Sequence, residues 1–173
     1  MALWVLVDLH EMARKSGDRK AAAGYLEKAA VGIEELKGPS SRKNELLLEM
    51  ARLRFDLMTD EKKGGVDKAA DDLAEAIIQT MEPKRSVLYL DGLIGDMRRY
   101  DRILPVLESY EAKAWAKGER SGSLVISLRR AALLMEIGKS EKAAVLLRTI
   151  IKRGGKLGFQ KAVRRAEELM RNI

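Results

Sequence analysis

Residues 17–29 read Gly-Asp-Arg-Lys-Ala-Ala-Ala-Gly-Tyr-Leu-Glu-Lys-Ala, and residues 138–150 read Gly-Lys-Ser-Glu-Lys-Ala-Ala-Val-Leu-Leu-Arg-Thr-Ile. Each stretch has a turn glycine, then a small residue (Ala22, Ala143), then a large one four positions later (Leu26, Leu147). A third stretch repeats the pattern with Ala69, Leu73 and Ala76. Small residues let two helices approach closely, and the large residue fills the adjoining gap. The spacing therefore predicts closely packed pairs of helices.

The rest of the chain has the same helical character. Only three prolines occur among 173 residues, and apolar residues return every three or four positions, which predicts an all-α fold. Turn signals rich in glycine, proline, serine and aspartate, such as those at 37–40, 60–65 and 99–101, divide the chain into nine predicted helices. These helices are expected near residues 2–16, 18–36, 41–59, 66–81, 85–98, 101–117, 123–137, 140–153 and 159–172.

Turns this short place consecutive helices antiparallel, so the helices should form hairpins. We expect four hairpins, near residues 2–36, 41–81, 85–117 and 123–153, and then a C-terminal capping helix at 159–172. Together they would form one domain over residues 1–173.

The turn glycines and the small residues after them resemble the tetratricopeptide repeat, and the first and fourth hairpins match it best. The third hairpin has Ile103, Leu107 and Tyr110 at the places of Ala69, Leu73 and Ala76, so its two small residues are replaced by large ones. The equivalent positions Ala22, Ala69, Ile103 and Ala143 are separated by 47, 34 and 40 residues, against a family period of about 34. The resemblance implies a right-handed solenoid whose concave groove binds a peptide or helix of a partner protein. The first helices of the hairpins would line that groove. The residues expected there are Val7, Glu11, Arg14 and Lys15 in the first hairpin and Val125, Leu128, Ala132 and Met135 in the last.

The net charge of +7 is concentrated at one end of the chain. Residues 1–60 carry 10 basic and 10 acidic side chains, residues 61–115 carry 9 and 11, and residues 116–173 carry 14 and 5. No acid occurs between Lys142 and Ala166. This section predicts a local anion-binding patch, which would suit an acidic protein or, less readily, nucleic acid. The expected patch residues are Lys152, Arg153, Lys156, Lys161, Arg164 and Arg165.

Catalytic residue types are scarce. The chain has no cysteine and one histidine, which excludes thiolate metal sites, disulfides and histidine-rich metal centres. His10 lies in an apolar helical stretch, where a packing role is the simpler interpretation. The glycines of Gly154-Gly155-Lys156-Leu157-Gly158 follow a helix and lack the order of a phosphate-binding loop, so they predict a helix end. We therefore expect no enzyme, no cofactor and no metal.

The N-terminal helix starts with a stretch that is apolar on all sides. Leu3, Trp4, Val5 and Leu6 would form an exposed patch, which predicts a homo-oligomer interface or the continuation of a longer array. The stretch has no basic residue before it and is interrupted by Asp8, so neither a signal peptide nor a membrane span is expected. A soluble cytoplasmic protein would follow.

Three functions remain open from the sequence. The first is a non-enzymatic scaffold or adaptor that binds another protein in its groove. The second is nucleic-acid binding through the basic C-terminal hairpin and cap. The third is an engineered helical-repeat protein without a natural partner, because abundant Lys, Arg and Glu with only two Asn and two Gln suit either a redesigned or a heat-adapted, thermostable chain.

Overall fold

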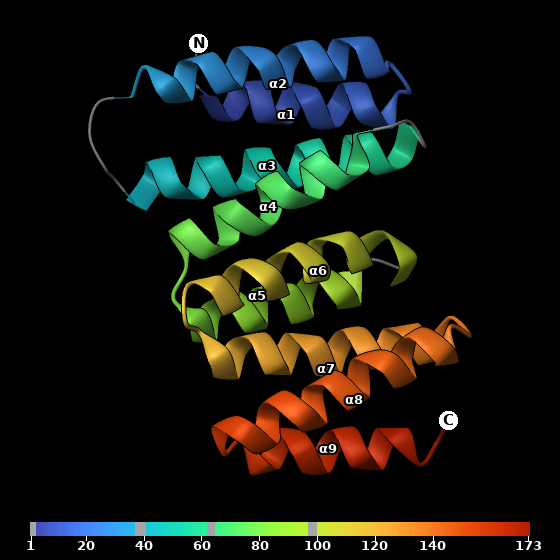
Figure 1. Cartoon of the computed structure of the whole chain (residues 1–173). Coiled ribbons are helices and arrows are strands. Elements are labelled where there is room, and N and C mark those ends of the chain that lie inside the picture. Colours follow the sequence, from blue (N-terminus) through green and yellow to red (C-terminus); the bar gives the residue numbers. More distant parts are fainter. Residues whose placement is uncertain (1–2, 37–40, 62–64, 97–99) are drawn as a thin grey trace. The chain divides into compact units, whose positions relative to one another are not determined.

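Helices make up the described part of the computed structural model, with no β-strand among residues 3–36, 41–61, 65–96 and 100–173 (Figure 1). This confirms the all-α prediction. The helices are α1 (Leu3–Lys15), α2 (Arg19–Glu34), α3 (Ser41–Glu61), α4 (Val66–Thr80), α5 (Pro83–Asp96), α6 (Tyr100–Ala116), α7 (Arg120–Glu136), α8 (Ser140–Leu157) and α9 (Gln160–Met170). The predicted turn at 37–40 lies outside the described residues. The same holds for residues 62–64 of the predicted turn at 60–65 and for residue 99 of the predicted turn at 99–101.

The chain divides into two compact units, Met1–Thr80 and Met81–Ile173, which we call unit 1 and unit 2. The division falls between the second and third predicted hairpins. In unit 1, α1 packs on α2, α2 on α3, and α3 on α4. In unit 2, each helix from α5 to α9 packs on the next, and α7 also contacts both α5 and α9. Helix α7 is therefore central to unit 2.

Four of the connections use the same turn. Gly17, Gly118, Gly138 and Gly158 all have positive φ, between 75° and 88°. In each, the glycine N–H donates to the carbonyl three residues back, and the next residue's N–H donates to the carbonyl five residues back. This is the Schellman motif, which satisfies the last carbonyls of a helix and favours glycine at its left-handed position. In unit 2 the three turns recur every 20 residues, so they join α6 to α9 by one repeated geometry.

Helix α8 differs from the sequence expectation. The prediction of a helix end at Gly154 was wrong, because α8 continues through Gly154 and Gly155 to Leu157. Gly154 is buried, and a Cβ atom there would lie 2.9 Å from Val163 Cγ2 on α9. This glycine therefore allows close contact between two helices, while Gly158 ends the helix.

The described core of each unit comes from its own helices. In unit 1, Leu26, Ile33, Leu53 and other buried side chains of α1, α2 and α3 form one cluster. In unit 2, Leu124, Leu147, Ala166 and other side chains of α7, α8 and α9 form another. No helix in the described residues is long and apolar enough to cross a lipid bilayer.

Candidate functional site

An open apolar cavity of about 500 Å³ lies in unit 2 between α7 and the start of α9. Its lining residues are Ser121, Leu124, Val125, Leu128, Gly158, Phe159, Gln160, Lys161 and Ala162. The cavity is large enough for a small ligand or for a few side chains of a partner. We call it the α7–α9 cavity.

Helical spacing and one turn bring these walls together. Ser121, Leu124, Val125 and Leu128 recur every three or four positions, so they share one face of α7. The left-handed Gly158 reverses the chain, and Phe159 and Ala162 then line the opposite wall. The close contact at Gly154 sets the approach of α9 to α8. The cavity is thus built by the turn that also ends α8.

The α7–α9 cavity has the chemistry of a site for apolar groups. Leu124 is buried, whereas Val125 remains 40% exposed at the cavity. Among the described residues of the lining, Lys161 is the one that is charged, and no carboxylate accompanies it. An apolar group with a negative charge beside it would therefore match the cavity best.

The predicted groove residues fall into two groups. Val125 and Leu128 line the cavity, and Ala132 and Met135 follow on the same face of α7, where Met135 packs on the core that α9 helps to form. In unit 1, Val7 is 6% exposed and belongs to the core, so it does not line an open surface. Arg14 pairs with Asp60 of α3 at 3.3 Å, and Lys15 pairs with Glu11 at 3.5 Å. Glu11, Arg14 and Lys15 are thus all paired with opposite charges within unit 1.

No protein-family model matches the chain, and no curated protein sequence matches it.

The predicted anion patch is also divided. Arg153 packs on Trp115, and its guanidinium lies 4.0 Å from Glu111. Arg165 pairs with Glu168 at 2.8 Å, and Lys161 lines the cavity. Lys152, Lys156 and Arg164 are exposed and have no carboxylate within ion-pair distance in the described part of the chain. The six residues therefore do not form one uniform site.

An ionic cluster around the buried Glu111 joins three helices of unit 2, and sequence analysis missed it. Glu111 of α6 is 8% exposed and accepts from Arg130 of α7 at 2.7 Å, while Arg153 approaches from α8. The guanidinium carbons of Arg120 and Arg153 lie 4.3 and 4.6 Å from the centroid of the Trp115 ring. Arg120 also donates to the Trp115 carbonyl. We call this set the Glu111 cluster, and its role in the geometry is to hold α6, α7 and α8 together.

The N-terminal patch is smaller than the sequence suggested. Trp4 and Val5 are exposed, whereas Leu6 is 5% exposed and lies in the core of unit 1. Leu3 belongs to α1, and its side chain lies outside the described part. An oligomer interface here stays a prediction that rests on Trp4 and Val5.

His10 is completely buried in unit 1. Its Nδ1 lies 2.9 Å from the Ala22 carbonyl oxygen, and because a carbonyl only accepts, Nδ1 carries the proton. The ring therefore links α1 to the first turn of α2. No group of three His, Asp or Glu side chains in the described residues is placed to hold a metal ion.

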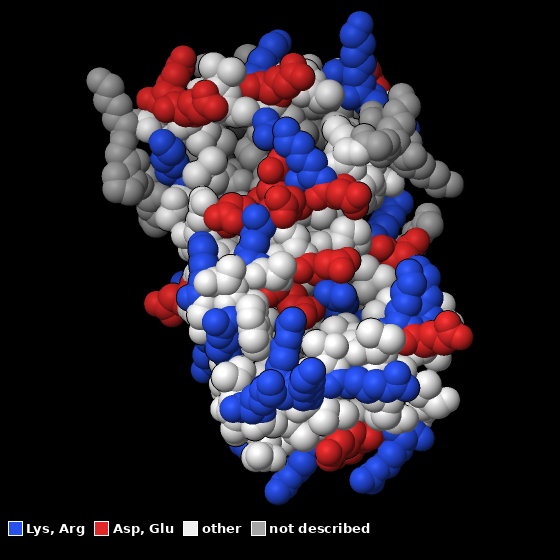
Figure 2. All heavy atoms as spheres, viewed as in Figure 1, with Lys and Arg blue, Asp and Glu red and all other residues white. Residues whose placement is uncertain are grey.

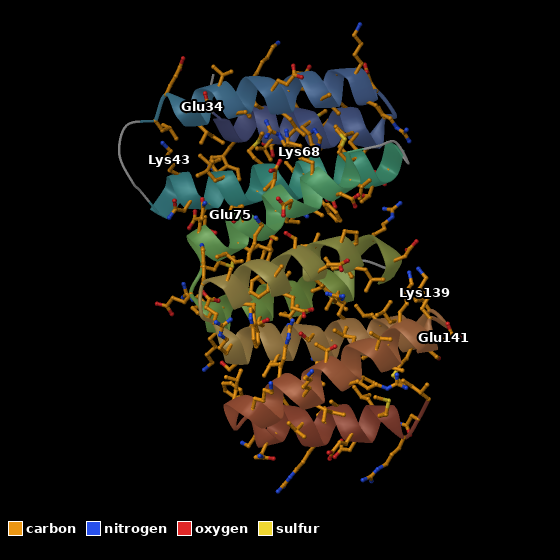
Figure 3. The ribbon with its side chains drawn as sticks, in the orientation of Figure 1. Glu34, Lys43, Lys68, Glu75, Lys139 and Glu141 are labelled. Carbon is orange, nitrogen blue, oxygen red and sulfur yellow. The ribbon has the colours of Figure 1, made fainter. Side chains whose placement is uncertain are left out.

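Another cavity, of about 350 Å³, lies in unit 1 and is lined by apolar and charged residues. Its carboxylates are Glu34, Asp72 and Glu75, and it also includes Arg54. Figure 3 shows Glu34 near the end of α2 and Glu75 on α4. Glu75 accepts a hydrogen bond from Gln79 at 2.7 Å, and Gln79 is another lining residue. One of the carboxylates of this cavity is therefore already hydrogen-bonded within the lining.

Phe159 and Ala162 are among the cavity residues that sequence analysis missed, together with Ser121, Leu124, Gly158 and Gln160. Their periodic pattern with Val163 and Ala166 predicts only the buried face of a capping helix. The available signal was the turn glycine Gly158, which has the same place before α9 as Gly138 has before α8.

Proposed function

We propose that this chain is a non-enzymatic protein-interaction module, and that unit 2 docks an apolar side chain of a partner segment in the α7–α9 cavity. The observation that carries this proposal is an open cavity whose walls are apolar except for Lys161 and a few uncharged polar groups. Partly exposed hydrophobic walls are the usual setting for the anchor residues of a docked helix or peptide.

The charge of unit 2 favours an acidic partner segment. Unit 2 has 20 basic and 11 acidic residues, a net charge of +9, whereas unit 1 has 13 and 15, a net charge of −2. A positive field attracts and orients an acidic segment before it docks. Lys161 would then pair with a carboxylate next to the apolar anchor.

A right-handed solenoid of hairpins with α9 as its cap belongs to the same proposal. Support comes from the consecutive packing of the helices within each unit and from the contacts of α7 with α5 and α9. The 20-residue spacing of the last three turns gives 40 residues for two helices, compared with about 34 in the tetratricopeptide repeat. The resemblance therefore concerns the type of packing more than the period.

The test uses a displayed library of random peptides, selected on the purified full chain. Affinities of the selected peptides are then measured by fluorescence anisotropy for the parent, for Val125→Glu and for Val145→Glu. Both valines are exposed in unit 2, but only Val125 lines the cavity. The same charge is therefore added at two comparable surface positions.

We expect selected peptides to combine a large apolar residue with acidic neighbours. Val125→Glu should weaken binding at least about tenfold, a loss of roughly 1.4 kcal/mol, and Val145→Glu should have little effect. Peptides that bind Val125→Glu as well as the parent would overturn the proposed site.

A further inference from the structure

The outer face of α8 has a row of exposed positive side chains that do not line the α7–α9 cavity. Its members are Lys142, Arg148, Lys152 and Lys156, all exposed, and we call them the α8 ridge. At 100° per residue they fall within roughly a third of the helix circumference. Figure 2 shows the Lys and Arg side chains gathered in a row over α8.

The α8 ridge is not neutralised by nearby acids. None of its four side chains has a carboxylate within ion-pair distance in the described residues, and no acid occurs in the sequence from Lys142 to Ala166. Other arginines of unit 2 are paired, for example Arg129 with Asp91 at 3.1 Å and Arg130 with Glu111 at 2.7 Å. Glu141, at the start of α8, lies beside Lys139 at the turn from α7 (Figure 3).

The spacing of these charges disfavours the helix itself. Arg148, Lys152 and Lys156 follow one another at four-residue intervals, and like charges at this spacing repel across one helical turn. A repulsive row that is exposed and unpaired is best explained by an external anion that neutralises it.

The dimensions of the α8 ridge suit an extended polyanion. Lys142 and Lys156 are 14 residues apart, which corresponds to about 21 Å along a helix. A nucleic-acid duplex of roughly six base pairs has the same length and carries one negative charge per ~1.7 Å of axis.

The composition of the surface distinguishes between two acidic partners. Protein interfaces are depleted of lysine and depend on apolar or aromatic anchors. The α8 ridge has three lysines, and Val145 is the large hydrophobic residue exposed between them. Binding to phosphates needs charge alone. We infer that the α8 ridge binds the phosphate backbone of a nucleic acid, without recognition of base sequence.

The experiment measures the anisotropy of a fluorescent 16-base-pair duplex, as DNA and as RNA, titrated with the full chain between 50 and 200 mM salt. The variant is Lys152→Glu/Lys156→Glu, and the matched control is Arg19→Glu/Lys20→Glu, which makes the same charge change at exposed positions of α2 in unit 1. Circular dichroism checks that both variants remain helical. A labelled polyglutamate peptide serves as the alternative acidic ligand.

With four phosphate contacts, the slope of log K against log salt should be about −3.6, and affinity should fall roughly 100-fold over this range. The ridge variant should lose at least about tenfold in affinity, with a slope closer to zero by about two, whereas the control should lose much less. No binding at 50 mM salt would overturn the inference. So would equal losses in variant and control, or polyglutamate binding that is as tight and as sensitive to the ridge variant.

Discussion

Gly154 illustrates how one residue sets the distance between two helices. Sequence patterns treat glycine as a helix breaker, because it has no side chain to restrict its backbone. Here the helix continues through Gly154. The close packing of this position against Val163 requires a residue without a Cβ atom. Gly155 is exposed, and no described atom beyond its own stretch of helix lies within 4 Å of the place that a Cβ would take, so its lack of a side chain serves no such contact.

Alanine substitutions at these two neighbours should therefore have opposite effects on stability. Gly154→Ala places a methyl group against Val163 and should lower the free energy of unfolding by about 1–3 kcal/mol. Gly155→Ala should raise it by about 0.5–1 kcal/mol, because alanine favours the helix. Urea denaturation of the two variants measures both changes, and a gain in stability at Gly154 would contradict the packing argument.

Asp56 provides a prediction for pH. Burial raises the pKa of its carboxyl above the ordinary value of 3.8, although Arg52 and Arg14 oppose the effect. The folded state therefore holds this proton more tightly than the unfolded state, and the stability from Asp56 is lost as pH rises from 3.8 through the folded pKa.

Asp56→Asn should therefore gain stability relative to the parent over that pH interval. The measured quantity is the difference in free energy of unfolding between the two chains, from urea titrations between pH 3.5 and 7. Other carboxyl groups are common to both chains, so their titration largely cancels. A difference that moves in the opposite direction with pH would show that the ion pairs outweigh burial.

At the scale of helices, the sequence predicted the elements better than the contacts between them. Turn glycines such as Gly17 and Gly138 act locally, because a left-handed residue with two backbone hydrogen bonds ends a helix wherever it occurs. Helix α5 begins at Pro83, two residues before its predicted start, since proline is well tolerated in the first turn. Local chemistry of this kind can be predicted from the sequence.

The candidate site could be predicted only in part, for a reason of geometry. Helical period places Val125 and Leu128 on one face of α7, and both line the cavity. The helical periodicity of apolar residues predicts which face of a helix is buried, but not the distance to the next helix. It therefore places Phe159 and Ala162 on a buried face without predicting a cavity there. Likewise, Glu111, Arg130 and Arg153 lie on three helices and are separated by 19 and 23 residues in sequence.

The Glu111 cluster predicts unequal effects for two glutamates that contact the same arginine. Arg130 pairs with Glu111, whose side chain is 10% exposed, and with Glu108, whose side chain is 70% exposed. Glu111→Gln should cost about 1.5–3 kcal/mol, because a charge-assisted hydrogen bond with little solvent access is lost. Glu108→Gln should cost less than about 1 kcal/mol, as for an exposed pair. Equal losses in denaturation experiments would argue against this difference in environment.

At the scale of the whole molecule, the net charge differs between the two units. The +7 of the chain is the balance of −2 in unit 1 and +9 in unit 2. The two described hydrophobic clusters also respect this boundary, since one draws on residues from Leu6 to Leu57 and the other on residues from Leu124 to Ala166. Truncation of a side chain in one of these clusters thus removes contacts within its own unit.

Two matched leucine truncations should therefore destabilise different parts of the chain. Leu26→Ala in unit 1 and Leu147→Ala in unit 2 each remove a buried side chain from a core cluster, at a cost of about 2–5 kcal/mol. Amide hydrogen exchange locates the effect, because protection falls where the opening free energy falls. Leu147→Ala should speed exchange in α7, α8 and α9 and leave α1, α2 and α3 protected, and Leu26→Ala should do the reverse. Faster exchange across both units in either variant would mean that the chain unfolds as one cooperative body.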